Sequence, residues 1–323
     1  MGMVDHEVQN CVGVLGATSL VGGCLLPLLT EAGWQVTAFS RRAVGPFGDG
    51  VAWRRLPLAE HPLPQHSAGA TRHSIRPPKD GSLIAGYPSK KAESDTPHWI
   101  CLAPIWVLPD YFDLLKAQGA RRVVVLSSTS RFTKDDSTDP EEQAVALRLA
   151  EAEARLREWA ESCGVEWVIL RPTLIYGLGR DKNIAEIARF IHRFGFFPLF
   201  GKANGLRQPI HAADVAGVCI TALTLPAVVN RAYNISGGET LAYRDLVARV
   251  FAALSRPPRL LPVPLSAFRV AIALLRCLPR YRHWSVAMAE RMGRDLVFDH
   301  GEAGRDLAFK ARSFELSAGD VVI

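Results

Sequence analysis

Two hydrophobic patterns alternate along this chain. Short, nearly continuous apolar runs predict buried strands at residues 12–15, 34–39, 51–56, 99–103, 122–126, 167–170 and 232–235. Stretches with apolar residues at every third or fourth position predict helices at residues 20–32, 107–118, 140–163, 184–194, 214–225 and 243–254. Such alternation is typical of an α/β protein. We therefore predict a Rossmann-type, doubly wound, mostly parallel sheet with helices on both faces.

The turn between the first strand and the first helix is the most informative motif. It reads Gly16-Ala-Thr-Ser-Leu-Val-Gly22, with Ser19 where a third glycine is usual. At such a turn the backbone can approach a dinucleotide pyrophosphate, and the helix N-terminus favours its negative charge. The alternative is a glycine turn in an α/β domain that binds no nucleotide. The residues that we expect to contact the cofactor here are Gly16, Thr18, Ser19, Leu20, Val21 and Gly22.

The second strand ends in Ser40-Arg41-Arg42, about twenty residues after the phosphate turn. An acidic residue at this place would hold the ribose 2′-hydroxyl of NAD, and none is present. Two guanidinium groups suit a 2′-phosphate, which a planar fork can bind with two hydrogen bonds. We expect NADP in preference to NAD; the alternative is a solvated arginine pair on a loop.

Composition and charge narrow the classes of ligand. The 323 residues are 48% hydrophobic and 22% charged, with a net charge of +6 carried mostly by scattered arginines. Scattered positive charge fits a small anionic substrate better than nucleic acid. No apolar run reaches the roughly 20 residues of a membrane span. The longest, residues 265–278, is interrupted by Arg269 and Arg276 and predicts a core helix, with a helix lying on a membrane surface as the alternative.

Cysteine spacing and the first residues suggest a compartment. The six cysteines are widely separated and form no C-x-x-C pair, so we expect neither a disulfide framework nor a metal site. The chain begins with polar and charged residues and shows no signal-peptide pattern. These features lead us to expect a cytoplasmic protein. Residues 59–98 stand apart because they show no convincing crossover helix; they are either a surface insertion or a locally degraded or frame-altered segment.

Several landmarks in order resemble the extended or atypical short-chain dehydrogenase/reductase superfamily, which includes nucleotide-sugar epimerases and dehydratases. After the glycine turn come Leu102-Ala-Pro104, Leu126-Ser-Ser-Thr129, Leu170-Arg-Pro172 with Tyr176-Gly177, and Arg207-Gln-Pro-Ile-His211. The resemblance implies a cofactor-binding lobe over residues 8–176, to which 207–240 partly return. It implies a smaller substrate lobe over 177–206 and 241–323. It also extends the set of expected cofactor contacts to Leu102, Ala103, Ser127, Ser128, Arg171 and Pro172.

The resemblance implies hydride transfer, with a tyrosine as acid/base, a lysine four residues later and a serine or threonine that orients the oxygen. Thr129 matches the orienting residue. Val145 and Leu149 stand where the tyrosine and lysine belong, so we expect the Tyr-x-x-x-Lys pair to be lacking. Tyr111 and Tyr176 are the candidate replacements, although a packing role with one hydrogen bond is the alternative for each.

The substrate side follows from the same resemblance. An arginine near Arg207 binds a diphosphate in sugar-nucleotide enzymes, and Lys182 and Asn183 resemble a substrate loop. These three residues either bind an anionic substrate or are only part of a basic surface that binds no substrate. Asp214 is expected to cap the following helix, and His211 to be structural.

Two functions remain open at this point. The first is an NAD(P)-dependent oxidoreductase or epimerase-like enzyme acting on a nucleotide sugar or similar anionic metabolite. The second is a non-catalytic NADP-binding redox sensor or assembly subunit, which the expected loss of the tyrosine–lysine pair would explain.

Overall fold

The structure is a computed structural model that describes residues 10–41, 50–56, 96–135, 137, 139–266 and 289–322. Its centre is a seven-stranded sheet in the order β11-β6-β5-β4-β1-β2-β3, in which every neighbouring pair is parallel. This topology confirms the doubly wound α/β fold expected from the sequence. The strands are β1 (Cys11–Leu15), β2 (Gln35–Ser40), β3 (Val51–Arg55), β4 (His98–Cys101), β5 (Arg122–Leu126), β6 (Glu166–Pro172) and β11 (Arg231–Ile235).

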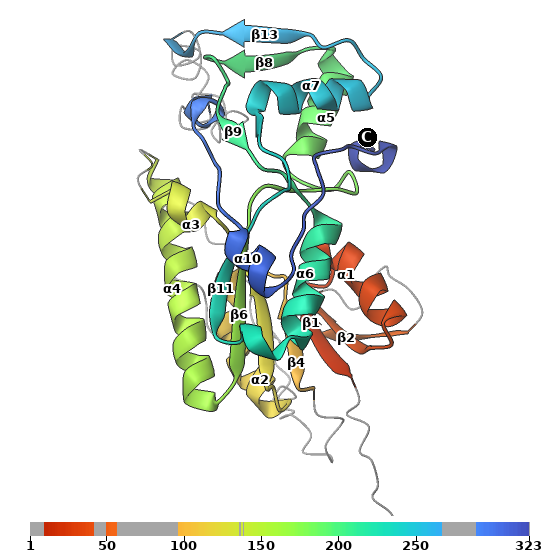
Figure 1. Cartoon of the computed structure of the whole chain (residues 1–323), viewed down its shortest axis with the longest axis vertical. Helices are drawn as coiled ribbons and strands as arrows, with labels where there is room; N and C mark the ends of the chain where they lie inside the picture. Colours follow the sequence, from red (N-terminus) through yellow and green to blue (C-terminus); the bar gives the residue numbers. More distant parts are fainter. Residues whose placement is uncertain are drawn as a thin grey trace, which may run out of the picture.

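Helices cover both faces of this sheet because its central strands are apolar on both sides (Figure 1). One face packs against α1 (Leu20–Glu31) and α6 (Ala212–Thr224), which also contact each other. The other face packs against η1 (Ile105–Tyr111), α2 (Phe112–Ala117) and the long α4 (Pro140–Cys163). The short α3 (Ser130–Thr133) links β5 to α4.

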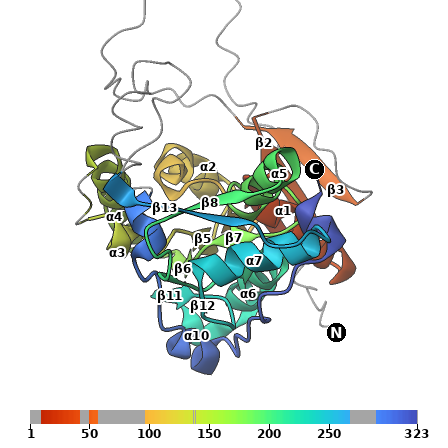
Figure 2. The same cartoon turned by 90° about the horizontal axis from the view of Figure 1, so that it is seen from above.

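A smaller lobe lies beyond the carboxyl ends of the strands and has an apolar core of its own (Figures 1 and 2). Helices α5 (Ile184–Phe194) and α7 (Tyr243–Ala253) pack together, and β8 (Phe197–Phe200) pairs with β13 (Leu260–Val263) in parallel. Two short pairs connect this lobe to the sheet: β7 (Ile175–Tyr176) with β10 (Ile210–His211), and β9 (Leu206–Arg207) with β12 (Leu241–Ala242).

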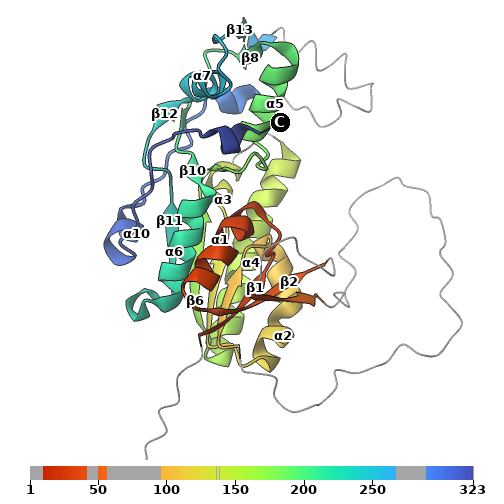
Figure 3. The same cartoon turned by 90° about the vertical axis from the view of Figure 1, so that its right-hand side faces the viewer.

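The chain passes between the two lobes several times. After the first crossing at β7 it returns through α6 and β11 to the sheet, and then crosses again to α7. Near its end, α10 (Gly301–Asp306) packs beside β11, and the segment from residue 307 then runs back to the small lobe and η5 (Ala318–Val321), as Figure 3 shows.

Two expectations about helices need correction. The helix expected at 107–118 is a 3-10 segment, η1, followed by the short α2, because Pro109 cannot donate a backbone hydrogen bond. The cap of α6 is His211 and not Asp214: the His211 Nδ1 accepts a hydrogen bond from the Ala213 N–H at 3.1 Å. Asp214 lies within the first turn, where its charge is favourable.

Some expectations fall outside the described residues, namely those on Arg42, on most of residues 59–98 and on most of residues 265–278. Among the described helices, none combines the length and the apolar character needed to cross a membrane. The five described cysteines are free, and the described residues contain no cluster of three or more His, Cys, Asp or Glu placed to hold a metal.

Candidate functional site

The phosphate turn has the geometry that the sequence predicts. Gly16 has φ +76°, and a Cβ there would lie 2.5 Å from the Ala103 backbone nitrogen. A Cβ on Gly22 would lie 2.1 Å from the Ala17 carbonyl oxygen. Ser19 caps α1, because its hydroxyl accepts a hydrogen bond from the Gly22 N–H at 3.1 Å. Gly16 therefore lets the turn pack against the loop after β4, and Gly22 lets the start of α1 pack against Ala17 within the turn.

This turn can accommodate a diphosphate. The helix itself offers no acceptor for the first-turn amides of Leu20 and Val21, as at any helix start. Those amides and the helix dipole suit a phosphate group. On the other side of the turn, Leu102 is fixed by a 2.8 Å hydrogen bond from its N–H to the Leu15 carbonyl.

The carboxyl end of β2 carries the groups expected at the ribose. Ser40 is buried and Arg41 is exposed. The sheet register places Arg55 of β3 opposite Ser40, and its side chain is also exposed. Arg55 is not among the residues predicted from the sequence, although the adjacent Arg54 and Arg55 at the end of the third strand were a usable signal.

Thr129 ties the ends of two strands together. Its N–H and its hydroxyl both donate to the Pro172 carbonyl oxygen, each at 3.2 Å, and the side chain is buried. Because the hydroxyl proton is used in this way, the oxygen lone pairs remain for a donor on a substrate. Thr129 can therefore orient a hydroxyl group but is not placed to remove its proton.

Near Thr129, three side chains converge on the carboxylate of Glu153, and we call this group the Glu153 hub. Glu153 is completely buried on α4 and accepts a 2.6 Å hydrogen bond from the Ser127 hydroxyl. Arg171 grips it through Nε at 2.9 Å and Nη2 at 2.6 Å, and Arg131 of α3 is a second ion-pair partner. Burial alone would raise the pKa of Glu153, but the hydrogen bonds from Arg171 and Ser127, with the charges of Arg171 and Arg131, lower it. Ser127 and Arg171, both expected to bind cofactor, thus direct their side chains to Glu153; Ser128 accepts from the Ser130 N–H at 3.1 Å.

The two α4 positions of the expected proton-transfer pair are apolar and face the protein. Leu149 is buried and Val145 is half-buried, and both pack in the core between α4, η1 and the sheet. One correction applies to the wider expectation. The Tyr-x-x-x-Lys spacing does occur once in the chain, at Tyr87 and Lys91. Both residues lie outside the described residues, and the lack of the pair on α4 stays a prediction from the resemblance.

The two candidate replacement tyrosines lie in different places. Tyr111 ends η1 and is mostly buried; burial and the Asp110 charge raise its pKa, while the Arg41 charge lowers it. That influence means that Tyr111 and Arg41 are close enough to interact electrostatically. Tyr176 is completely buried in the small lobe, and burial raises its pKa to about 12. Its hydroxyl donates to the Glu315 carbonyl at 3.3 Å, so its contacts are those of a packing residue.

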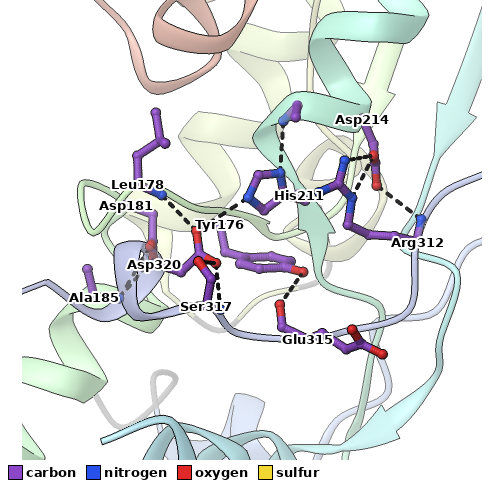
Figure 4. Close-up of polar contacts among 11 residues, drawn as sticks. Tyr176, Leu178, Asp181, Ala185, His211, Asp214, Arg312, Glu315, Ser317 and Asp320 are labelled. Carbon is purple, nitrogen blue, oxygen red and sulfur yellow. Dashed lines mark hydrogen bonds and ion pairs between the residues drawn. The ribbon is translucent and has the colours of Figure 1, made fainter.

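The last part of the chain is fastened beside Tyr176 (Figure 4). Asp320 accepts hydrogen bonds from the Leu178 N–H at 3.0 Å and from the Ser317 N–H and hydroxyl, and its Oδ1 lies 3.3 Å from His211 Nε2. Because His211 Nδ1 is an acceptor, Nε2 carries the proton and donates to Asp320. Asp214 holds Arg312 at 2.9 Å through Nε. We call residues 307–322 the C-terminal strap.

The residues expected to bind substrate differ in their environments. Lys182 and Asn183 are exposed before α5, whose first amides are capped by the buried Asp181. Arg207 is buried, and burial lowers its pKa to about 10. Its guanidinium donates to the carbonyls of Leu206 at 2.8 Å, Arg294 at 2.7 Å and Arg291. Those contacts hold the segment 291–294 in place and use the guanidinium donors that a substrate phosphate would need. The substrate role of Arg207 therefore stays a prediction.

Three further charged residues were missed or misjudged from the sequence. Arg180, exposed in the loop after β7, donates to the Thr18 carbonyl at 3.2 Å and so reaches the phosphate turn from the small lobe. Glu142, at the start of α4, pairs with Arg291 and accepts from the Ser137 hydroxyl at 2.8 Å. Lys134, after α3, is half-buried, and burial lowers the pKa of its amine. Arg180 and Arg291 both link segments that are far apart in the sequence.

The family model described as the NAD dependent epimerase/dehydratase family matches residues 12–236. The chain belongs to this family. The UDP-glucose 4-epimerase of Vibrio cholerae is 27% identical in an alignment of 287 residues that covers 82% of each chain. Among solved structures, MoeE5 in complex with UDP-glucose and NAD has a TM-score of 0.62 at 19% identity and covers 94% of both chains. The UDP-glucose 4-epimerase of Thermotoga maritima, solved with UDP-glucose, has a TM-score of 0.63 at 13% identity and covers 93% of both.

Membership of the epimerase/dehydratase family confirms the resemblance inferred from the ordered landmarks. The matched region begins in β1 and ends just after β11, so it contains the phosphate turn, Thr129 and the Glu153 hub. Within the matched region, the turn from Gly16 to Gly22 is tightly folded, and Val145 and Leu149 on α4 are apolar.

Proposed function

We propose that this protein binds NAD(P) at the Gly16–Gly22 turn and acts on a nucleotide sugar or a related anionic metabolite. The observation that carries the proposal is the preserved turn, where Gly16, Ser19 and Gly22 adopt a conformation that leaves first-turn amides for a diphosphate. The likeness to epimerases that act on UDP-glucose supports the substrate class. When bound, the nicotinamide would accept or return a hydride.

The chain's own residues would have these roles. Thr129 orients the reacting hydroxyl from its position on Pro172. Arg180, Lys182 and Asn183 lie in the loop that reaches the phosphate turn, where their donors suit a phosphate group. Arg41, with Arg42 and Arg55, favours NADP through the 2′-phosphate. We further propose that proton transfer to or from the substrate is slow or uses a group other than the usual tyrosine and lysine, because the side chains of Val145 and Leu149 can neither donate nor accept a proton.

The test is to combine calorimetric titration with turnover. The full chain is titrated with NADPH and NADH, and then incubated with the cofactor and UDP-glucose, UDP-glucuronate or UDP-N-acetylglucosamine. Binding with slow epimerisation or slow absorbance change at 340 nm is expected. If neither NADPH nor NADH binds, the assignment of the turn as a cofactor site is overturned.

The second candidate is a non-catalytic NADP-binding redox sensor or assembly subunit. The same apolar pair on α4 favours it, because a protein that only senses a cofactor needs no acid/base. Tight cofactor binding that shifts on reduction, together with no turnover of any nucleotide sugar, would favour this candidate over the enzyme.

A further inference from the structure

The outer tip of the small lobe exposes a group of aromatic and aliphatic side chains. Phe194 at the end of α5 is 51% exposed, Phe196 is 36% exposed, and Leu261 on β13 is 51% exposed. Phe190 lies beneath the first two, with ring centroids at 4.6 Å from Phe194 and 5.8 Å from Phe196. We call Phe194, Phe196 and Leu261 the aromatic tip. Exposed apolar groups gathered in this way mark an interaction surface more often than isolated ones do.

Three arginines lie near the aromatic tip. The Arg193 guanidinium lies 5.3 Å from the centroid of the Phe194 ring. Arg256 donates to the carbonyls of Ile191 and His192, at 3.0 and 3.1 Å, and so sits at the C-terminal end of α5. The backbone of Arg259 accepts from the Phe197 N–H at 2.9 Å, which brings its exposed side chain next to the same strands. The acid of α5, Glu186, is already paired with Arg189 at 2.8 Å.

The sequence around this surface contains positive charge and almost no negative charge. Residues 187–213 contain no Asp or Glu, and residues 246–266 contain three arginines and no Asp or Glu; the exposed Asp245, at the start of α7, borders the second range. A net charge of +6 over 323 residues does not by itself require stretches of this length without an acidic residue. Like charge around the tip opposes its use as an interface between two copies of this chain, and it attracts a surface of opposite sign.

The shape of the lobe favours a flat partner. In Figure 1, α5, β8, α7 and β13 form the upper end of the molecule, beyond the sheet and both of its helical layers. Exposed aromatic side chains at such an end, with Arg193, Arg256 and Arg259 nearby, match the interface of a bilayer. There the rings enter the headgroup region, and the guanidinium groups pair with anionic lipids.

We propose that the aromatic tip docks on a membrane surface that contains anionic phospholipid, with Phe194, Phe196 and Leu261 inserted and Arg193, Arg256 and Arg259 bound to headgroup phosphates. The surface lies on the small lobe, away from the phosphate turn, so docking leaves the cofactor end of the site accessible. The proposal does not depend on which substrate the protein uses.

Co-sedimentation of the full chain with vesicles tests this. Vesicles of phosphatidylcholine with about one-third phosphatidylglycerol are compared with vesicles of phosphatidylcholine alone, at low and high salt. Binding to the anionic vesicles that weakens with salt is expected. Arg193→Glu and Arg259→Glu should each reduce the partition coefficient at least about fivefold, as loss of one arginine at the surface predicts. The double variant Phe194→Ser/Phe196→Ser should reduce it about tenfold or more.

Matched controls separate a local surface from general stickiness. Val297→Ser removes an apolar side chain that is 42% exposed elsewhere, and Arg121→Glu reverses an exposed charge before β5, at the opposite end of the sheet. Both controls should bind vesicles like the parent chain. Phe194→Trp should keep binding and give a blue shift of fluorescence on vesicles that the parent chain does not show.

Three outcomes would overturn the proposal. The first is that the chain does not sediment with anionic vesicles. The second is that the control variants lose as much vesicle binding as the tip variants. The third is that the chain does not bind vesicles and the double variant Phe194→Ser/Phe196→Ser loses self-association or has a lower unfolding midpoint than the parent chain. In that case another copy, or the chain itself, covers the tip.

Discussion

Glu153 and Arg171 form a two-pronged ion pair inside the protein, with Arg171 Nε 2.9 Å from Oε1 and Nη2 2.6 Å from Oε2 of a carboxylate that has no solvent exposure. The pair joins α4 to the carboxyl end of β6, and Ser127 at the end of β5 donates to the same carboxylate. The ends of two strands that border the site are therefore held by one side chain.

Removing this charge should destabilise the fold strongly. Glu153→Gln leaves two buried or half-buried guanidinium groups without their counter-ion, a change that typically costs about 3–5 kcal/mol. Denaturant unfolding measures the loss. Glu151→Gln, at an exposed position on the same helix, is the matched control and should change stability by less than about 0.5 kcal/mol. Equal stability of the two variants would contradict a supporting role for the pair.

The same carboxylate predicts the acid limit of stability. The pKa of Glu153 is lower in the folded protein than in the unfolded chain. Its contribution is therefore present above the unfolded pKa, near 4.3, and is lost as the pH falls from there through the folded value. The stability gap between the parent chain and Glu153→Gln should narrow over that interval in urea titrations at successive pH values.

Cofactor binding should depend on Gly16. Gly16→Val adds a branched side chain at φ +76°, where even a Cβ would contact the Ala103 nitrogen at 2.5 Å, so binding of NADPH should be lost. Gly33→Ala is the control, because it has a similar φ of +78° but nothing within 4 Å of its Cβ. Calorimetry should show that the control binds, with circular dichroism confirming that both variants fold. Equal NADPH affinity of Gly16→Val and the parent would disprove the assignment.

Cofactor choice should depend on the arginines after β2. Replacing Arg41 and Arg42 with alanine should lower the affinity for NADPH by about one to two decades per arginine, since a charge-assisted hydrogen bond contributes about 1.5–3 kcal/mol. NADH should be affected far less. Arg55→Ala shows whether the exposed neighbour on β3 shares the 2′-phosphate. Parallel losses for the two cofactors would mean that the arginines support the fold and not the selectivity.

The C-terminal strap should be fastened mainly by Asp320. Asp320→Ala removes the acceptor for the Leu178 N–H, the Ser317 groups and His211, and should cost about 1–3 kcal/mol. Asp245→Ala, an exposed acid in the first turn of α7, should cost less than 1 kcal/mol. Thermal unfolding and limited proteolysis check both. A strap that is cleaved equally fast in the two variants would contradict this role.

The sequence predicts the sheet well because its strands are short apolar runs and its helices have clear periodicity. The prediction failed where a local rule competed with a distant contact. Asp214 is a good capping residue, yet it pairs with Arg312, 98 positions later, and His211 takes the cap. The guanidinium of Arg207 binds carbonyls 84 and 87 positions away. Contacts at such separations leave no periodic pattern, so the surroundings of Tyr176 and Arg207 could not be inferred.

The order of the strands also bears on how the protein is made. The outer strand β11 ends at Ile235, and it pairs with β6, which ends at Pro172, so the sheet is incomplete until 63 further residues have been synthesised. At about 5–20 residues per second, β6 waits several seconds on the ribosome with an unpaired edge. During that interval the nascent chain presents a long apolar strand to any other chain nearby, and a chaperone that covers strand edges would act on it then.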